Sequence, residues 1–225
     1  MNADLCFEFP KSKWEELSER LDGTDENAWV EGIGVFERRM RERFFSSIDA
    51  LVAADTKPDL SPSGSTHAGE CIPGFAIIAL CCLLIDTLQG FREAPPSAAN
   101  PVGPCSFPSG PCIRPPAGTN QQFIKFLRRP AFGGSFNGEI AKSFAWGIRN
   151  GILHEAETRK WVIWREEPAG KIVAQEEDGY ALNRSLFYAA VEEEFASYLR
   201  ELRDPANKEP RQRFKEKMDE LCREA

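Results

Sequence analysis

Apolar residues recur every three or four positions over most of the chain, which is the spacing of one face of an α-helix. The longest such stripe runs from Trp29 to Leu51 and predicts a helix over residues 26–54. The same spacing predicts further helices over residues 11–21, 75–93, 120–128, 137–153, 183–202 and 210–223. A chain built from such helices is expected to bury their apolar faces together as a helical bundle.

Two segments depart from the helical pattern. Residues 160–164 and 171–174 are rich in β-formers and are separated by a proline and a glycine, so they predict a small β-hairpin over 160–174. Residues 94–119 are rich in proline and glycine and predict a long irregular surface insertion. We therefore predict a mainly α fold, a single domain over residues 1–225 that ends in a helix within 208–225, with one β-hairpin and one Pro-rich loop.

Composition narrows the class of protein. A chain of 225 residues is long enough to bury a substantial core. The longest apolar run, Phe75 to Ile85, is too short to span a bilayer, and the N-terminal residues do not have the pattern of a signal peptide. Seven cysteines without a regular spacing indicate reduced thiols. We therefore expect a soluble, cytoplasmic protein that does not associate with a membrane.

Neither a metal nor a cofactor is predicted. Cys105 and Cys112 lie in the same loop and resemble half of a metal site, but no second pair of Cys or His residues has a suitable spacing. His67 lies in a polar loop over residues 56–72, where a lone histidine is most often incidental. The net charge of −7 argues against broad, nonspecific binding to nucleic acid, although a local basic site remains compatible with it.

The strongest chemical signal lies between Trp146 and Glu155. This stretch contains His154, one of only two histidines in the chain, and Arg149 five positions earlier, followed directly by Asn150. Histidine exchanges protons near neutral pH, and arginine is well shaped to hold a phosphate or the charge that develops on it. These residue types together point to phosphate chemistry.

A projection at about 100° per residue divides the predicted 137–153 helix into two faces. One face is apolar and predicts contact with the core. The opposite face mixes apolar and polar side chains, a composition that suits a protein contact or a cleft better than bulk water: Trp146, Arg149, Asn150, Leu153 and His154. A purely structural interpretation also stays open. His154 would then be a cation near a helix C-terminus, and Arg149 would pair with Glu155 or Glu157.

Two other sets of polar residues lie on predicted helices. Asp86, Gln89 and Arg92 fall at a spacing of three, and they either line a polar seam or mark the emerging end of a buried helix. Four arginines on the 26–54 helix form either a phosphate-binding face or a solvated face paired with neighbouring glutamates: Arg38, Arg39, Arg41 and Arg43.

The R-N-G-I-L-H stretch over residues 149–154 resembles the R-N-x-x-x-H signature of the HEPN superfamily, the higher eukaryote and prokaryote nucleotide-binding domains. The segments Phe36–Arg39, Ile78–Asp86 and Gly151–Thr158, with the hairpin that follows, are similar to a HEPN-like group from prokaryotic defence and toxin loci. The resemblance covers residues 26–203 without the insertion and implies a small helical bundle.

The resemblance implies a metal-independent endoribonuclease, acting as a toxin or antiphage defence effector. Two protomers would bring their motif helices together, with Trp146 and Leu153 at the seam. His154 would act as base or acid on the RNA 2′-hydroxyl, Arg149 would hold the scissile phosphate, and Asn150 would orient these groups. The products would be a 2′,3′-cyclic phosphate and a 5′-hydroxyl. An antitoxin or defence partner encoded nearby would be a further expected partner.

A ribonuclease needs a basic path for its substrate. The residues expected to provide it are Arg38, Arg39, Arg41, Lys125, Arg128, Arg129, Arg159 and Lys160. The alternative function is a noncatalytic HEPN-like module that dimerises or binds a partner through the same mixed face. A third interpretation is a nucleotide or small-ligand binder that uses the arginines of residues 38–43.

Overall fold

The computed structural model describes residues 4–6, 8–21, 25–55, 72–93 and 119–223. His67, Cys105, Cys112 and residues 94–118 of the loop predicted over 94–119 lie outside the described residues. The helical elements are α1 (Lys11–Leu21), α2 (Glu26–Met40), the π-helical turn η1 (Arg41–Phe45), α3 (Ser46–Asp55), α4 (Ile72–Arg92), α5 (Thr119–Leu127), the 3₁₀ turn η2 (Pro130–Phe132), α6 (Gly138–Phe144), the π-helical turn η3 (Ala145–Asn150), α7 (Gly151–Glu155), α8 (Arg184–Arg203) and α9 (Lys208–Arg223). Every helix predicted from the sequence has a counterpart, so the mainly α fold is confirmed.

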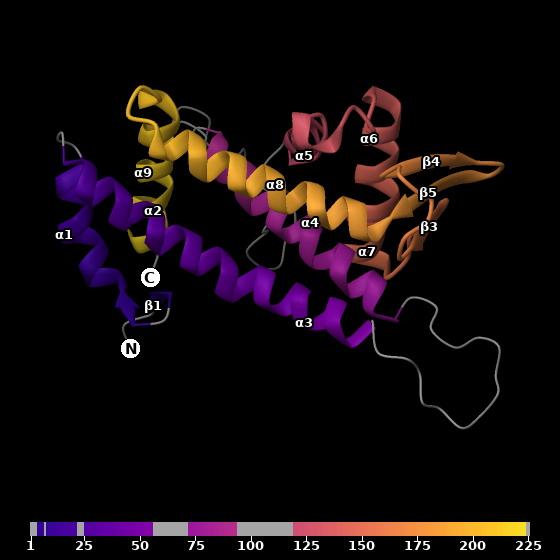
Figure 1. The fold of residues 1–225 in the computed structure, drawn as a ribbon, viewed down its shortest axis with the longest axis horizontal. Coiled ribbons are helices and arrows are strands. Elements are labelled where there is room, and N and C mark those ends of the chain that lie inside the picture. Colours follow the sequence, from indigo (N-terminus) through magenta and orange to yellow (C-terminus); the bar gives the residue numbers. More distant parts are fainter. Residues whose placement is uncertain (1–3, 7, 22–24, 56–71, 94–118, 224–225) are drawn as a thin grey trace, which may run out of the picture.

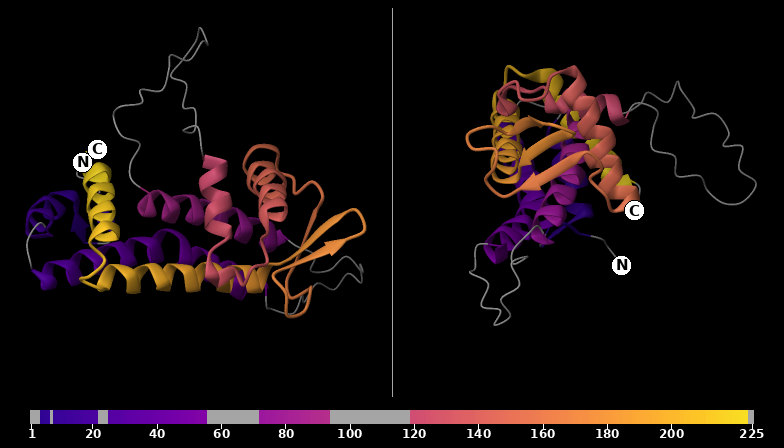
Figure 2. Two further views of the ribbon diagram at one scale, coloured as in Figure 1. Left: turned by 90° about the horizontal axis from the view of Figure 1, so that it is seen from above. Right: turned by 90° about the vertical axis from the view of Figure 1, so that its right-hand side faces the viewer.

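Three long helical segments run alongside one another and form the body of the molecule. The continuous segment α2–η1–α3 lies lengthwise beside α8, and α4 packs against α3 and α8 (Figures 1 and 2). Side-chain caps define where two of these helices begin: Asp25 accepts a hydrogen bond from the Ala28 amide, and Asn183 accepts one from the Leu186 amide. The α5 and α6 helices lie side by side across these long helices, with α6 nearer to the sheet (Figure 2).

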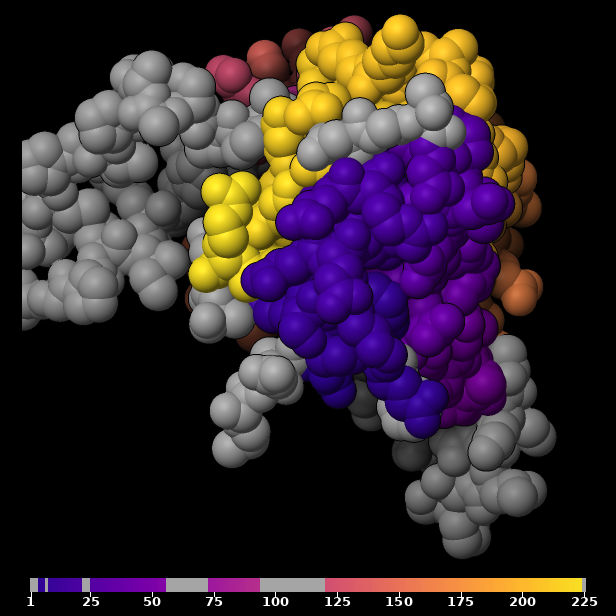
Figure 3. All heavy atoms as spheres, turned by 90° about the vertical axis from the view of Figure 1, so that its left-hand side faces the viewer, coloured from indigo at the N-terminus to yellow at the C-terminus, as the bar shows by residue number. Residues whose placement is uncertain are grey.

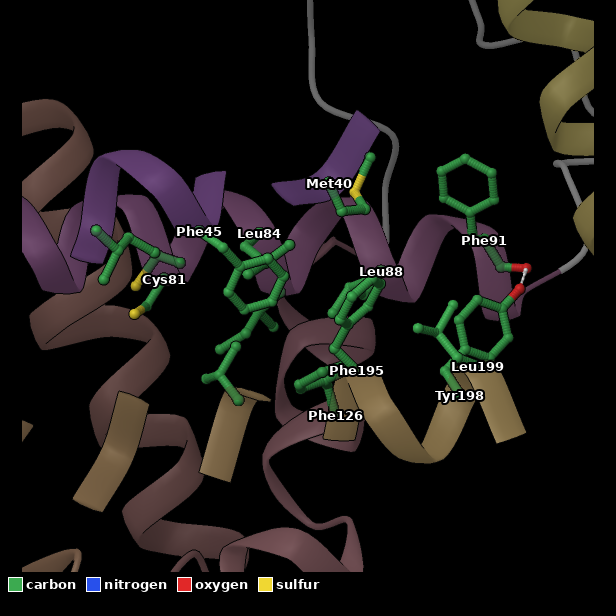
Figure 4. Packing of buried hydrophobic residues seen from close by; sticks show 14 of the residues in the cluster. Met40, Phe45, Cys81, Leu84, Leu88, Phe91, Phe126, Phe195, Tyr198 and Leu199 are labelled. Carbon is green, nitrogen blue, oxygen red and sulfur yellow. Dashed lines mark hydrogen bonds between the residues drawn. The ribbon is translucent and has the colours of Figure 1, made fainter. Parts of the chain in front are cut away.

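Large aromatic side chains fill the space between these helices. The rings of Phe36 and Phe91 lie 4.5 Å apart, and Phe45 packs 5.0 Å from Phe195. Tyr198 is also buried, and its hydroxyl donates to the Phe91 carbonyl at 3.2 Å, so its polar end is satisfied within the core (Figure 4). Most phenylalanines of the described residues are therefore core residues.

The α4 helix is the central element of this core. Its Pro73–Arg92 stretch is long and apolar enough to cross a bilayer, but more than half of its most apolar part is buried inside the protein. Core helices of soluble proteins have this composition because they are covered on most sides. The placement of α4 therefore agrees with the soluble protein predicted from the sequence.

A buried ion-pair network joins α4 to α8. Arg92 contacts Glu194 at 2.7 Å and Glu201 at 2.5 Å, and its guanidinium lies 4.3 Å from the centroid of the Tyr198 ring. Arg129, which follows α5, reaches the same Glu194 at 3.2 Å. The Asp86–Gln89–Arg92 spacing thus marks a real polar seam, since each of these side chains bonds to a polar partner.

The predicted β-hairpin over 160–174 is wrong in its pairing. β3 (Trp161–Trp164) and β4 (Val173–Glu176) both flank β5 (Gly179–Asn183), with β3 parallel and β4 antiparallel to it. The hairpin is therefore β4–β5, closed by the short turn before Gly179. Residues 179–183 were not predicted as a strand because their apolar run continues directly into α8.

The two ends of the described chain lie together at the end of the molecule farthest from this sheet. Figure 3 shows the N-terminal segment beside the C-terminal helix on that face. The Trp14 indole and the Ser18 hydroxyl both donate to the Asp219 carboxylate of α9, at 2.8 and 2.7 Å. A short pair of strands precedes α1 and was not predicted: β1 (Asp4–Cys6) and β2 (Phe9–Pro10).

Candidate functional site

The helix that carries the R-N-G-I-L-H stretch is continuous from α6 through η3 to α7. It begins at Asn137, whose side chain accepts hydrogen bonds from the amides of Glu139 and Ile140. It ends at Ala156, which adopts the left-handed conformation with φ of 55°. The π-helical turn in its middle contains Arg149 and Asn150. Such turns are rare and are found frequently at functional sites.

Two glycines of this helix let the following turn fold back onto it. A Cβ at Gly147 would lie 2.8 Å from the Trp161 ring, and one at Gly151 would lie 2.4 Å from the Glu157 carbonyl oxygen. Real Cβ atoms do not approach backbone oxygens so closely. The two glycines therefore set the position of the 156–161 turn, and with it the surroundings of His154.

Replacing Gly151 with alanine is expected to lower the free energy of unfolding by about 1–3 kcal/mol, because the new methyl group overlaps a backbone oxygen. Gly138 is the matched control: it lies in the same helix, and a Cβ there would have no neighbour within 4 Å. Gly138→Ala should leave the stability unchanged or raise it slightly. Urea denaturation of both variants measures the difference, and equal stabilities would contradict the packing of this turn.

The Arg149 side chain is buried between α4 and α5 in a set of polar contacts. Its Nε and Nη2 donate to Asp86 Oδ2 at 3.1 and 2.8 Å. Its Nη1 donates to the Oδ1 atoms of Asn150 and Asn120 at 2.9 and 3.3 Å. The guanidinium also lies 5.9 Å from the centroid of the Phe123 ring. Arg149 is therefore held in one orientation by a carboxylate on one side and two amides on the other.

Asp86 was not assigned to the site from the sequence. Burial raises the pKa of its carboxyl group above the ordinary value, and the adjacent Arg149 guanidinium opposes part of that rise. Its side chain keeps about a quarter of its surface exposed. The available signal was that Asp86 is the first charge after the long apolar run of α4, where an unpaired carboxylate is costly.

The predicted two-face division of the motif helix is wrong for Arg149. The 100° projection placed it on the same face as Trp146, but it is only 9% exposed and points toward α4. The physical reason is the π-helical turn, which takes more residues per turn than an α-helix and so rotates the residues that follow. The suggested pairing of Arg149 with Glu155 or Glu157 is wrong as well, because Arg149 pairs with Asp86.

The other residues of the predicted mixed face lie at or near the surface. His154 is exposed in the last turn of α7, and Trp146 is 60% exposed, while Leu153 and Asn150 are half-buried. Asn150 lies between the two other residues of the motif. Its side chain accepts a hydrogen bond from Arg149, and it precedes His154 by one helical turn. The structure thus presents one accessible imidazole and one enclosed guanidinium on the same helix.

Arg159 connects the 156–161 turn to this helix. Its guanidinium lies 3.4 Å from the centroid of the Trp146 ring and donates to the Glu155 carboxylate at 2.6 and 3.2 Å. A third hydrogen bond reaches the Trp146 carbonyl at 3.3 Å. Trp146 therefore carries a cation against its ring while 60% of its surface stays exposed.

The residues predicted to bind RNA are not gathered into one patch. Arg38 and Arg39 lie on α2, where Arg39 donates to the Leu5 carbonyl at 2.6 Å, far from α7 in Figure 1. Arg129 forms an ion pair with Glu194. Arg41 lies in η1 and pairs with Glu37. Lys125 and Arg128 lie at the end of α5, where Lys125 pairs with Glu93 and Arg128 is exposed. Arg159 and Lys160 lie in the 156–161 turn, where Arg159 pairs with Glu155 and Lys160 is exposed.

Within the described residues, no three or more His, Cys, Asp and Glu side chains cluster in a way that could hold a metal ion. Comparisons with protein-family models, curated proteins and solved structures give no significant match to this chain. The chemistry of the site therefore has to be inferred from its own residues.

Proposed function

We propose that this protein is a metal-independent endoribonuclease of the HEPN type, which acts in the cytoplasm as a homodimer and serves as a toxin or antiphage defence effector. The observation that carries the proposal is the pairing, on one π-turn helix, of an oriented Arg149 with an exposed His154. Cleavage by the 2′-hydroxyl requires only a proton acceptor and donor and a cation at the phosphate, and these two residue types supply both.

The proposed reaction is a transesterification. His154 removes the proton from the 2′-hydroxyl of the substrate, and the 2′-oxygen attacks the adjacent phosphorus. The bond to the 5′-oxygen breaks, and that oxygen takes a proton from the protonated imidazole of the second protomer. The products are a 2′,3′-cyclic phosphate and a 5′-hydroxyl. Arg149 stabilises the charge on the phosphorane through Nη1, where a phosphate oxygen replaces the two amide oxygens as acceptor.

Asp86 has a positioning role in this proposal. It occupies Nε and Nη2 of Arg149 and so turns Nη1 toward Asn150 and Asn120, the more accessible side of the guanidinium. A prepositioned donor loses little conformational freedom when the phosphate binds. The dimer would bring Trp146 and Leu153 of two protomers together and place both His154 side chains in one cleft.

Replacing His154 with alanine is expected to lower RNA cleavage by about 100-fold or more, because general acid–base catalysis contributes on that scale. The side chain is exposed, so the thermal unfolding temperature should stay unchanged. His67→Ala is the matched control, since it removes the only other histidine of the chain. Cleavage of a labelled RNA in EDTA provides the measurement, and equal rates for the two variants would overturn the role of His154.

A noncatalytic dimerisation module is the second candidate, and two observations favour it. Trp146 exposes 60% of its surface, and Arg149 is already neutralised by Asp86. In that case Leu153→Glu and Trp146→Ala would weaken self-association in light scattering, and no RNA cleavage would accompany the dimer. The ribonuclease proposal expects the same loss of association together with a loss of cleavage.

A further inference from the structure

A hollow of about 400 Å³ opens at the end of the three-stranded sheet, where Arg159 lines it and also contacts the motif helix. It is within the size range of small-ligand pockets. Its lining comes from the 156–161 turn, from β3 and from the β4–β5 hairpin: Arg159, Lys160, Val162, Glu176, Asp178, Gly179 and Tyr180.

One wall of the hollow is a fixed aromatic ring. Tyr180 stacks on Trp161 with ring centroids 4.8 Å apart and an angle of 28° between the planes. Trp161 is buried, and its indole donates to the Ser143 hydroxyl of α6 at 3.1 Å, so the stack is anchored to the motif helix. A rigid aromatic wall of this kind favours a planar ligand, because the Tyr180 ring is already held in place and loses little conformational entropy when a ligand stacks on it.

The base of the hollow depends on close contact between two strands. The Tyr180 amide donates to the Lys160 carbonyl at 3.0 Å, and a Cβ at Gly179 would lie 1.9 Å from the same oxygen. Only glycine allows this approach, so the turn of the β4–β5 hairpin is brought against residue 160. The carboxylate of Asp178 and the ammonium of Lys160 consequently lie on the same small surface.

The rim carries both hydrogen-bond donors and acceptors. Lys160 provides donors, and Glu176 and Asp178 provide acceptors. The guanidinium of Arg159, the other cation of the lining, is already bonded to Glu155 and to the Trp146 carbonyl. The two carboxylates therefore leave a simple anion little to gain here. A neutral planar group with donors on one edge and acceptors on another gains from both sets.

We propose that this hollow binds one unpaired guanine base of an RNA substrate, an inference that rests on the proposed ribonuclease function. Tyr180 stacks on the base, as aromatic side chains do in recognition of single-stranded RNA. Lys160 donates to the guanine O6 and N7 acceptors. A carboxylate of the rim accepts the two adjacent donors on the Watson–Crick edge, N1–H and the N2 amino group. Among the four RNA bases, only guanine presents two adjacent donors there.

Arg159 joins the hollow to the helix that carries the catalytic residues. Arg159 lines the hollow and at the same time contacts Trp146 and Glu155 of the motif helix. A base held in the hollow therefore places its neighbouring phosphates along this helix. The consequence is a preference for cleavage next to guanine in single-stranded RNA.

The test measures nucleotide binding separately from cleavage. The His154→Ala protein is titrated with 5′-GMP, 5′-AMP, 5′-CMP and 5′-UMP by calorimetry. We expect GMP to bind about 10-fold more tightly than the others, and Asp178→Asn or Lys160→Ala to weaken GMP binding by about 10-fold. Trp164→Ala is the matched control, because Trp164 is exposed on β3 and does not line the hollow.

Three results would overturn the guanine site: no saturable binding of any nucleotide, equal binding of all four, or GMP binding that survives both Asp178→Asn and Lys160→Ala. The failure of the proposed function gives a different result. A wild-type protein that cuts no RNA, and whose His154→Ala form still binds GMP selectively, would keep the guanine site and remove the ribonuclease activity.

Discussion

An Arg149→Ala protein is expected to lose RNA cleavage by about 100- to 1000-fold, the scale measured when one donor to a developing oxyanion is removed. The same change leaves Asp86 without its guanidinium in a largely buried position. Breaking one side of a buried pair costs about 3 kcal/mol of folding free energy. Activity assays and urea denaturation of one preparation therefore report both effects.

Arg149 has a catalytic role and also stabilises the fold through its ion pair with Asp86. A control must therefore lower the stability without touching the catalytic residues. Arg184 is suitable, since it forms a buried ion pair with Asp55 at 2.6 Å and lies outside the motif. Arg184→Ala should destabilise the protein to a similar degree while the folded fraction keeps its cleavage rate. Arg149→Lys should fold better than Arg149→Ala yet remain inactive, because an ammonium cannot bond Asp86 and a phosphate in the arginine geometry. Equal losses of activity in Arg149→Ala and Arg184→Ala would contradict a catalytic Arg149.

The largest effect on stability is expected from Arg92→Ala, at about 3–5 kcal/mol. Its guanidinium bonds Glu194 and Glu201 and stacks on Tyr198 inside the core. The alanine protein would keep the Glu194 carboxylate in a buried position, where Arg129 is the cation left to pair with it among the described residues. Chemical denaturation monitored by circular dichroism gives the free energy of unfolding.

The matched comparison for Arg92 is Arg200→Ala on α8, the helix that carries Glu194 and Glu201. Arg200 pairs with Glu193, and both side chains are about 60% exposed, so solvent screens their attraction. This change should cost less than about 1 kcal/mol. A loss of similar size for the two variants would show that the buried network contributes no more than a surface pair.

The helices could be predicted from the sequence because the residues they bury are apolar and recur every three or four positions. The stripe from Trp29 to Leu51 and the apolar run of α4 both became core faces, as the spacing indicates. The strand β5 was missed because its apolar residues pass directly into α8. Its pairing with β3 is parallel and joins segments that local pattern cannot relate.

The site was only partly predictable for a similar reason. The residue types at Arg149, Asn150 and His154 were visible, and so was their place at the end of a late helix. The contact between Arg149 and Asp86 joins residues 63 positions apart and depends on how the motif helix packs on α4. The π-helical turn that directs Arg149 inward has no period in the sequence, so a regular projection placed this side chain on the wrong face.

The central claim is that the motif helix cleaves RNA without a metal ion. The most direct measurement incubates the purified protein with labelled single-stranded RNA in EDTA and identifies the ends of the products. We expect 2′,3′-cyclic phosphate and 5′-hydroxyl ends, present with the wild type and with His67→Ala and absent with His154→Ala. Cleavage that requires Mg²⁺, or that continues in the His154→Ala protein, would contradict the account.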